Sequence, residues 1–241
     1  MSQMFSCKSL ITLELKCCLL SPNDLRFPTV RTLLLDNCSF DFHDENCSSG
    51  CLDFSQGCPK LIALSLVECM FTDAGSLKKL VKVTMGPNLV NLTIVDIECI
   101  LSNPHKFEIR APGLEDFTLL HNSNYARFPS IDFPALKHAV VDVWKPNYPQ
   151  EHRQEGLHNA EFISLPYSII QALSMAPGVL EHQPSSPYRR LKSLTLKLTP
   201  YQKPCQTPAK VDQKHWQIPW KLVTYFLSGS PADSTDLLIQ S

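Results

Sequence analysis

The chain has 241 residues, of which 44% are hydrophobic, so it is long enough to bury one sizeable core. Lys and Arg number 22 against 23 Asp and Glu, and this balance excludes the strongly basic surface of a typical nucleic-acid-binding domain. No window approaches the ~18 apolar residues of a membrane span, and the N-terminus lacks the unbroken apolar run of a secretory signal. We therefore expect a cytoplasmic or nuclear protein with reduced cysteines, bound neither to nucleic acid nor to a membrane.

A short pattern recurs along the chain, with one apolar residue, two variable residues, and then two apolar residues separated by a variable one. The first copy has Leu10, Leu13 and Leu15, followed by Cys18. The later copies begin at Val30, Leu61, Leu89, Leu114, Leu136 and Leu191. The steps between first positions are 20, 31, 28, 25, 22 and 55 residues, so the last step has room for one more copy. We expect this degraded copy in residues 160–183, as a short helix followed by a poor strand.

The spacing of the apolar residues predicts strands that stack side by side. Two apolar residues at alternate positions point to the same side of a strand, and one such strand cannot bury its own apolar side. Stacking the copies makes a parallel sheet over a continuous core, with Leu13, Leu33, Leu64, Leu92 and Leu194 in one interior row. The pattern is typical of a leucine-rich-repeat solenoid. We expect one α/β domain over residues 1–241, with a curved parallel sheet of about seven or eight strands on the concave side and short helices and irregular turns on the convex side.

Cysteine and proline recur at fixed places in the pattern. Cys18, Cys38 and Cys69 occupy one slot just after the strand, where a small buried side chain fits and a reactive thiol is not expected. Proline lacks the N–H group that a central ladder position needs but is tolerated at a strand's first residues, so we expect prolines to mark the entry to the strands. They stand two positions before the first apolar residue of five copies: Pro28, Pro59, Pro87, Pro112 and Pro134.

The two ends of the stack differ from its middle. Residues 216–241 are expected to form a C-terminal cap, with one apolar helix face followed by a strand-like segment at Leu237–Ile239. The first copy has no obvious N-terminal cap, and its exposed edge should favour pairing with another chain.

Several segments resemble a known family, among them FPTVRTLLLDNCSF, CPKLIALSLVEC and RRLKSLTLKL, together with the tail IPWKLVTYFLSGSP. They look like the repeats of plant F-box/leucine-rich-repeat proteins of the FBD-containing branch. The resemblance implies substrate recognition by the repeats of a cullin ubiquitin ligase subunit. Family members begin with an F-box, which this sequence lacks, so the alternatives are a truncated gene model and an interaction protein without ligase coupling.

A partner site is expected on the concave side, where the variable residues of successive strands form columns. Apolar side chains gather at the centre of these columns, with charged residues at both ends, as in protein interfaces. We expect the partner, a protein, to contact Leu34, Val67, Val95, Leu120 and Val140. The alternative is ordinary surface, since folded proteins expose much apolar area.

No catalytic, cofactor or metal site is expected. His43, Cys47, Cys51 and Cys58 lie close together, but their spacing matches no common zinc pattern, and a loop with incidental cysteines is the favoured interpretation. No family-type signature surrounds any Cys–His pair, and the glycines form no phosphate-binding loop. The sequence therefore predicts a binding protein and not an enzyme.

Overall fold

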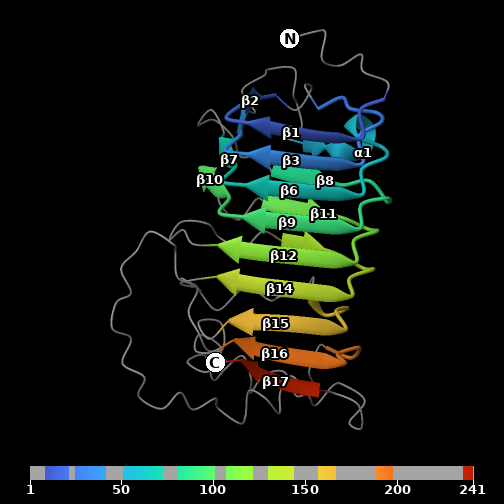
Figure 1. Ribbon diagram of the computed structural model, residues 1–241, viewed down its shortest axis with the longest axis vertical. Coiled ribbons are helices and arrows are strands. Elements are labelled where there is room, and N and C mark those ends of the chain that lie inside the picture. The colour runs from blue at the N-terminus through green and yellow to red at the C-terminus, as the bar shows by residue number, and fades with distance from the viewer. Residues whose placement is uncertain are drawn as a thin grey trace, which may run out of the picture.

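The computed structural model describes residues 9–21, 25–41, 51–72, 81–100, 107–121, 130–143, 157–166, 188–197 and 236–240. Its largest element is a nine-stranded sheet in which every neighbouring pair of strands is parallel (Figure 1). Its strands stand in chain order: β1 (Thr12–Lys16), β3 (Thr32–Asp36), β6 (Ala63–Val67), β9 (Asn91–Val95), β12 (Asp116–His121), β14 (His138–Val143), β15 (Phe162–Pro166), β16 (Ser193–Lys197) and β17 (Asp236–Gln240). The fold is α/β with mostly parallel strands, and none of the described sheets closes into a barrel.

The alternating leucines of the repeat form the inner side of this sheet. Leu13 pairs with Leu33, and the same row continues through Leu64 and Leu92 to Leu194. Leu33, Leu64 and Leu92 are each 1% exposed, whereas Leu13, in the edge strand, is only partly buried. The predicted interior row is confirmed.

Two smaller parallel sheets enclose the core from the other sides. One contains β10 (Glu98–Ile100), β7 (Met70–Thr72), β4 (Ser39–Asp41) and β2 (Leu19–Leu20). The other contains β13 (Ser130–Asp132), β11 (Phe107–Arg110), β8 (Val81–Thr84) and β5 (Cys51–Asp53). The chain passes from the large sheet through the first small sheet and the second, and then returns to the large sheet. The core between them includes the stacked rings of Phe40 and Phe71, whose centroids are 4.9 Å apart.

The outer side therefore differs from the expectation of short helices. In the described ranges it carries these strands and one four-residue helix, α1 (Phe54–Gly57), whose first turn is capped by the carboxylate of Asp53. Stacked short strands satisfy their backbone groups between neighbouring repeats, and rows such as Leu52, Val83 and Ile109 bury their side chains as the inner leucines do.

A left-handed residue follows each of the first four strands of the large sheet. Cys17, Asn37, Glu68 and Asp96 have φ between 48° and 52°. The N–H of each donates to a carbonyl at the end of the next strand, as from Cys17 to the carbonyl of Asp36 at 2.9 Å and from Asp96 to that of Leu120, the second-to-last residue of β12, at 2.9 Å. This turn directs the chain from the large sheet into β2, β4, β7 and β10.

The cysteine slot lies one residue after this turn. Cys38 and Cys69 are buried, and their Sγ atoms lie 3.4 and 3.3 Å from the carbonyl oxygens of Leu15 and Leu35 in the preceding repeats. Burial raises the pKa of the Cys69 thiol to about 11, and burial also raises the pKa of Cys38. The slot thus holds small buried side chains that stay protonated, as predicted; Cys18, in the edge repeat, is half-buried.

The predicted placement of prolines at the entry to the strands is confirmed. The prolines lie in tight turns that precede the strands. In the turn at Pro59, the N–H of Leu61 donates to the carbonyl of Cys58 at 3.0 Å, and the same bond joins Leu114 to Ala111 at 3.2 Å. Proline is favoured at the second residue of a β-turn because its fixed φ suits that position.

The copy expected to be degraded contains a regular strand at its start. β15 pairs with both β14 and β16, and Ala160, Ile163 and Leu165 are all buried. The expectation of a helix at the start of residues 160–183 is wrong, because Phe162–Pro166 form a strand. The strand was hard to recognise because this copy has Ala160 where the pattern has leucine. Residues 167–183 lie outside the described residues.

The C-terminal segment also adds a strand. β17 pairs with β16 in the same parallel register, so the sheet has nine strands and not seven or eight. The helix expected in the predicted cap of residues 216–241 lies outside the described residues.

Candidate protein-binding face

One side of the nine-stranded sheet faces the core, and the other, here called the open face, points away from it. The pairing aligns the outward residues of successive strands in three columns. The middle column runs Glu14, Leu34, Ser65, Thr93, Thr118, Val140, Ser164, Thr195 and Leu238. The column nearest the carboxyl ends of the strands begins Lys16, Asp36, Val67, Val95, Leu120 and Asp142.

All five residues predicted to contact a partner lie on the open face. The structure brings Val67, Val95 and Leu120 together on three adjacent strands, as an apolar run. Leu34 and Val140 belong to the middle column and are separated from each other by the hydroxyl side chains of Ser65, Thr93 and Thr118. Each of the five is half-buried, because neighbouring side chains of the column cover part of its surface. The predicted columns are confirmed, and whether a partner binds there stays a prediction.

Three outward residues of β15 were missed. Phe162 is 40% exposed, whereas the hydroxyl of Ser164, between Val140 and Thr195, is buried, and Pro166, beside Lys197, is buried too. The spacing of Ile163 and Leu165 behind Ala160 was the signal that could have found them. Leu238 of β17, 52% exposed, extends the same face.

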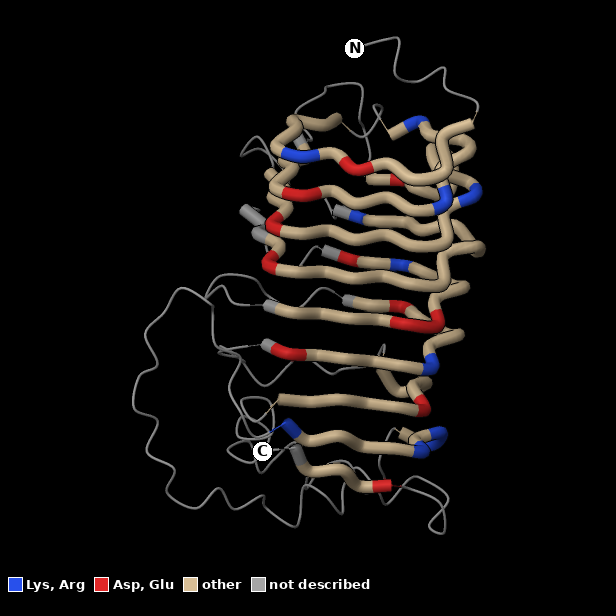
Figure 2. The backbone as a smooth tube through the Cα atoms, viewed as in Figure 1, with Lys and Arg blue, Asp and Glu red and all other residues tan. Residues whose placement is uncertain are grey.

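Charged residues lie mostly at the two ends of the strands, and in the middle column of the open face the charged residue is Glu14 (Figure 2). At the carboxyl edge Lys16 forms ion pairs with Glu14 at 2.9 Å and Asp36 at 3.5 Å. The hydrogen bond with Glu14 is the main cause that raises the pKa of Lys16. Burial raises the pKa of Asp142, against the attraction of Lys197.

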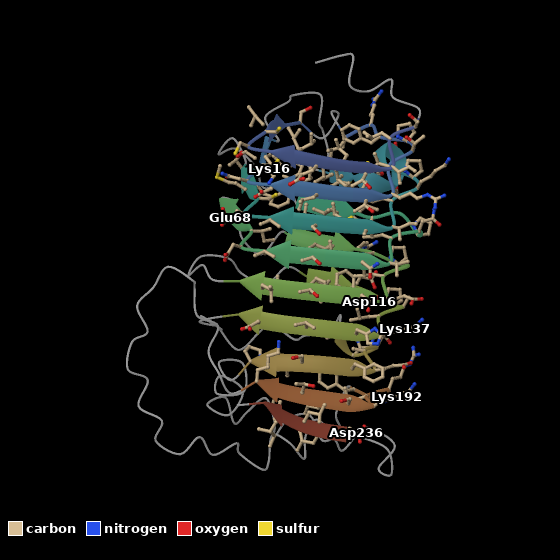
Figure 3. The ribbon with its side chains drawn as sticks, viewed as in Figure 1. Lys16, Glu68, Asp116, Lys137, Lys192 and Asp236 are labelled. Atoms are coloured by element: carbon tan, nitrogen blue, oxygen red, sulfur yellow. The ribbon has the colours of Figure 1, made fainter. Side chains whose placement is uncertain are left out.

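At the amino ends of the strands, ion pairs join residues of neighbouring repeats. Lys137 pairs with Glu115 at 2.7 Å, and Glu161 pairs with Lys192 at 2.7 Å and with Arg190 at 2.9 Å. Figure 3 shows Lys137 and Lys192 at this edge, and Lys16 and Glu68 at the other. The hydrogen bond from Lys192 is the main cause that lowers the pKa of Glu161. The basic side chains of these pairs are 45–58% exposed, although Glu161 is only 15% exposed, so each pair lies at the surface and adds little to stability. The pairs fix the charge pattern at this end of the strands.

The same edge also carries an aromatic contact. His138 Nδ1 lies 2.6 Å from Asp116 Oδ1, and the imidazole stacks on the ring of Phe162 with centroids 4.8 Å apart. Three strands thus supply an acid, a base and an aromatic ring at one exposed place. Such a group can hydrogen-bond and stack with a partner side chain.

Of the four residues considered for zinc, the structure describes Cys51 and Cys58. Cys51 lies in β5 and Cys58 is buried after α1, where burial raises the pKa of its thiol. His43 and Cys47 lie outside the described residues. Within the ranges that the structure describes, no cluster of three or more His, Cys, Asp or Glu side chains is placed to hold a metal ion.

Comparisons with protein-family models, with curated proteins and with solved structures find no match for this chain. In the described part of the chain, no helix has the length and apolar character needed to cross a membrane.

Proposed function

We propose that the chain is a leucine-rich-repeat solenoid whose open face binds another protein. The observation that carries the proposal is the register of the nine-stranded sheet, which sets Val67, Val95 and Leu120 side by side on its open face. A core of apolar side chains inside a charged rim is the arrangement of specific protein interfaces. The residues that carry the argument are aliphatic, so the proposed role is binding, without catalysis, cofactor or metal.

The proposed role within the cell is substrate recognition for an F-box-type ubiquitin ligase. Support comes from the resemblance of the repeats to those of plant F-box/leucine-rich-repeat proteins. The link to the cullin ligase is then indirect, through a segment or a partner that carries an F-box. A cytoplasmic or nuclear location is part of the same proposal.

A second candidate is a structural or regulatory interaction protein without ligase coupling. The apolar run of Val67, Val95 and Leu120 supports this candidate as well, because it can bind a partner without a ligase adaptor. Co-purification distinguishes the two: a ligase adaptor bound to the tagged chain supports the first, and partner capture without the adaptor supports the second.

The test of the binding face uses three purified chains as bait in cell extract. These are the wild type, the double variant Val95→Asp with Leu120→Asp, and the control Met70→Asp, whose half-buried residue lies in β7 of a small sheet. Proteins bound by the wild type and the control should be lost from the double variant. Desolvating two carboxylates at the centre of an interface costs about 2 kcal/mol or more each, which is at least a tenfold loss of affinity per site. Undiminished capture by a folded double variant refutes the open face as the binding site.

A further inference from the structure

The two ends of the nine-stranded sheet carry most of the exposed apolar surface in the described structure. Among the described residues, six large hydrophobic side chains are more than a third exposed, and four of these six belong to the first and last repeats. Those four are Ile11 (59%), Leu19 (67%), Leu238 (52%) and Ile239 (54%). Leu238 belongs to the open face, whereas Ile239 continues the inner row of Leu196, which is 0% exposed; at the other end of this row Leu15 is only partly buried. Among the described residues, none covers the core at either end of the sheet.

The backbone of each end strand also has one side that is unpaired among the described residues. β1 and β17 are the edge strands, and no described strand pairs with their outer sides. At β1, the N–H of Cys17 and the carbonyl of Ile11 bond to β3. The direction of the backbone hydrogen bonds alternates along a strand, so the N–H and C=O groups of Thr12, Glu14 and Lys16 point away from β3, in the plane of the sheet. At β17 the N–H of Asp236 bonds to Lys192, so the outward groups there belong to Leu237 and Ile239.

We propose that copies of this chain associate head to tail, with β17 of one copy pairing in parallel with β1 of the next. All strands of the sheet run the same way, so this junction repeats the geometry of β1 with β3 and of β16 with β17. In that register Leu237 falls beside Leu13, and Ile239 falls beside Leu15. Both half-covered leucine rows are then completed by the other copy.

The charges of β1 and β17 also favour pairing with a second copy of this chain. Edge strands usually resist pairing through Lys, Pro or a bulge. β17 (DLLIQ) has one charged residue, Asp236, which meets Thr12 in the proposed register. In β1, Lys16 is neutralised by Glu14 at 2.9 Å. No like charges face each other across the junction. The interface is heterologous, so the product is a growing chain of copies and not a closed pair.

The test blocks each end separately with proline, which removes one outward N–H group. Glu14→Pro blocks β1, Ile239→Pro blocks β17, and the matched controls Glu14→Gln and Ile239→Val keep the N–H. Light scattering should show that the average mass of the wild type and of both controls rises above the 27.2 kDa of one chain as the protein concentration increases. Each proline variant alone should stay at one chain. An equimolar mixture of the two proline variants should form a dimer, with twice that mass, and nothing larger.

Three results overturn the proposal: a wild type that stays at one chain at every concentration, a proline variant that dimerises alone, or a mixture that forms no dimer. Circular dichroism checks that each variant is folded. A second pair avoids proline altogether, because residue 238 is exposed and faces Glu14 of the next copy in the proposed register. Leu238→Glu should weaken association more than Leu238→Lys does, and equal effects count against the register. The outcome is independent of partner binding on the open face, which the Val95 and Leu120 variants test.

Discussion

Strand β3 contains three consecutive leucines, and the fold assigns them different roles. Leu33 and Leu35 are 1% and 0% exposed and point into the core, whereas Leu34 is half-buried on the open face. Replacing each with alanine in turn therefore tests the orientation of the whole sheet, because the three substitutions are chemically identical and differ only in direction.

The expected costs follow from burial. Leu33→Ala and Leu35→Ala each leave a cavity in a closed core, and such changes cost about 2–5 kcal/mol of unfolding free energy. Leu34→Ala removes a side chain that keeps part of its surface in water and leaves no cavity, so the loss should be about 1 kcal/mol or less. The difference between inner and outer positions should exceed the error of a urea titration.

Urea unfolding followed by circular dichroism measures the three free energies. If the slope of free energy against urea is unchanged, the shift in midpoint reports stability alone. Equal losses at all three positions, or the largest loss at Leu34, would refute the period-two orientation and with it the open face. Because repeats contact mainly their neighbours, the comparison is best made within this one strand.

Three further predictions concern single side chains. The Cys69 thiol has a pKa of about 11 and is 0% exposed, so it should resist a thiol reagent at pH 8 until the chain unfolds. The exposed Cys17 should react at once. Rapid reaction of both thiols in the folded protein contradicts the buried slot. Burial raises the pKa of Asp142, so the folded state holds that proton more tightly than the unfolded state, and its contribution to stability falls as pH rises through the interval above 3.8. Asp142→Asn should therefore raise the midpoint of thermal unfolding at pH 7 and lose that advantage well below pH 3.8; a lower midpoint at pH 7 refutes the assignment. A Cβ at Gly113 would collide with the carbonyl of Pro87 in the preceding turn, so Gly113→Ala should cost about 1–3 kcal/mol in the same urea assay, and a neutral effect shows that the two turns are not packed together.

The sequence determined the inner side of the large sheet well because one physical requirement acts at every copy. An apolar residue at each inner position recurs wherever a strand must be buried, so the row from Leu13 to Leu194 could be predicted in every copy except the one that contains β15. The open-face columns followed, since they are set by the same alternation. Ala160 weakened the pattern just enough to hide β15, although Ile163 and Leu165 behind it are as buried as their counterparts.

The outer sheets could not be predicted for a different reason. Strands such as β2 and β10 are only two or three residues long, too short for alternation to distinguish them from turns. They form because each lies against its equivalent in the next repeat, and that contact is not local in the sequence. The stacking of His138 on Phe162 is of the same kind, since 24 positions separate the two residues along the chain.

The parallel ladder also has a mechanical consequence. Its interstrand hydrogen bonds run along the stack, at right angles to the strands themselves. Tension applied between Thr12 and Gln240 would therefore load one ladder at a time and peel the strands apart in sequence. In a single-molecule pulling experiment, the protein should lengthen in a series of small low-force steps, as a zipper opens, and not in one abrupt rupture.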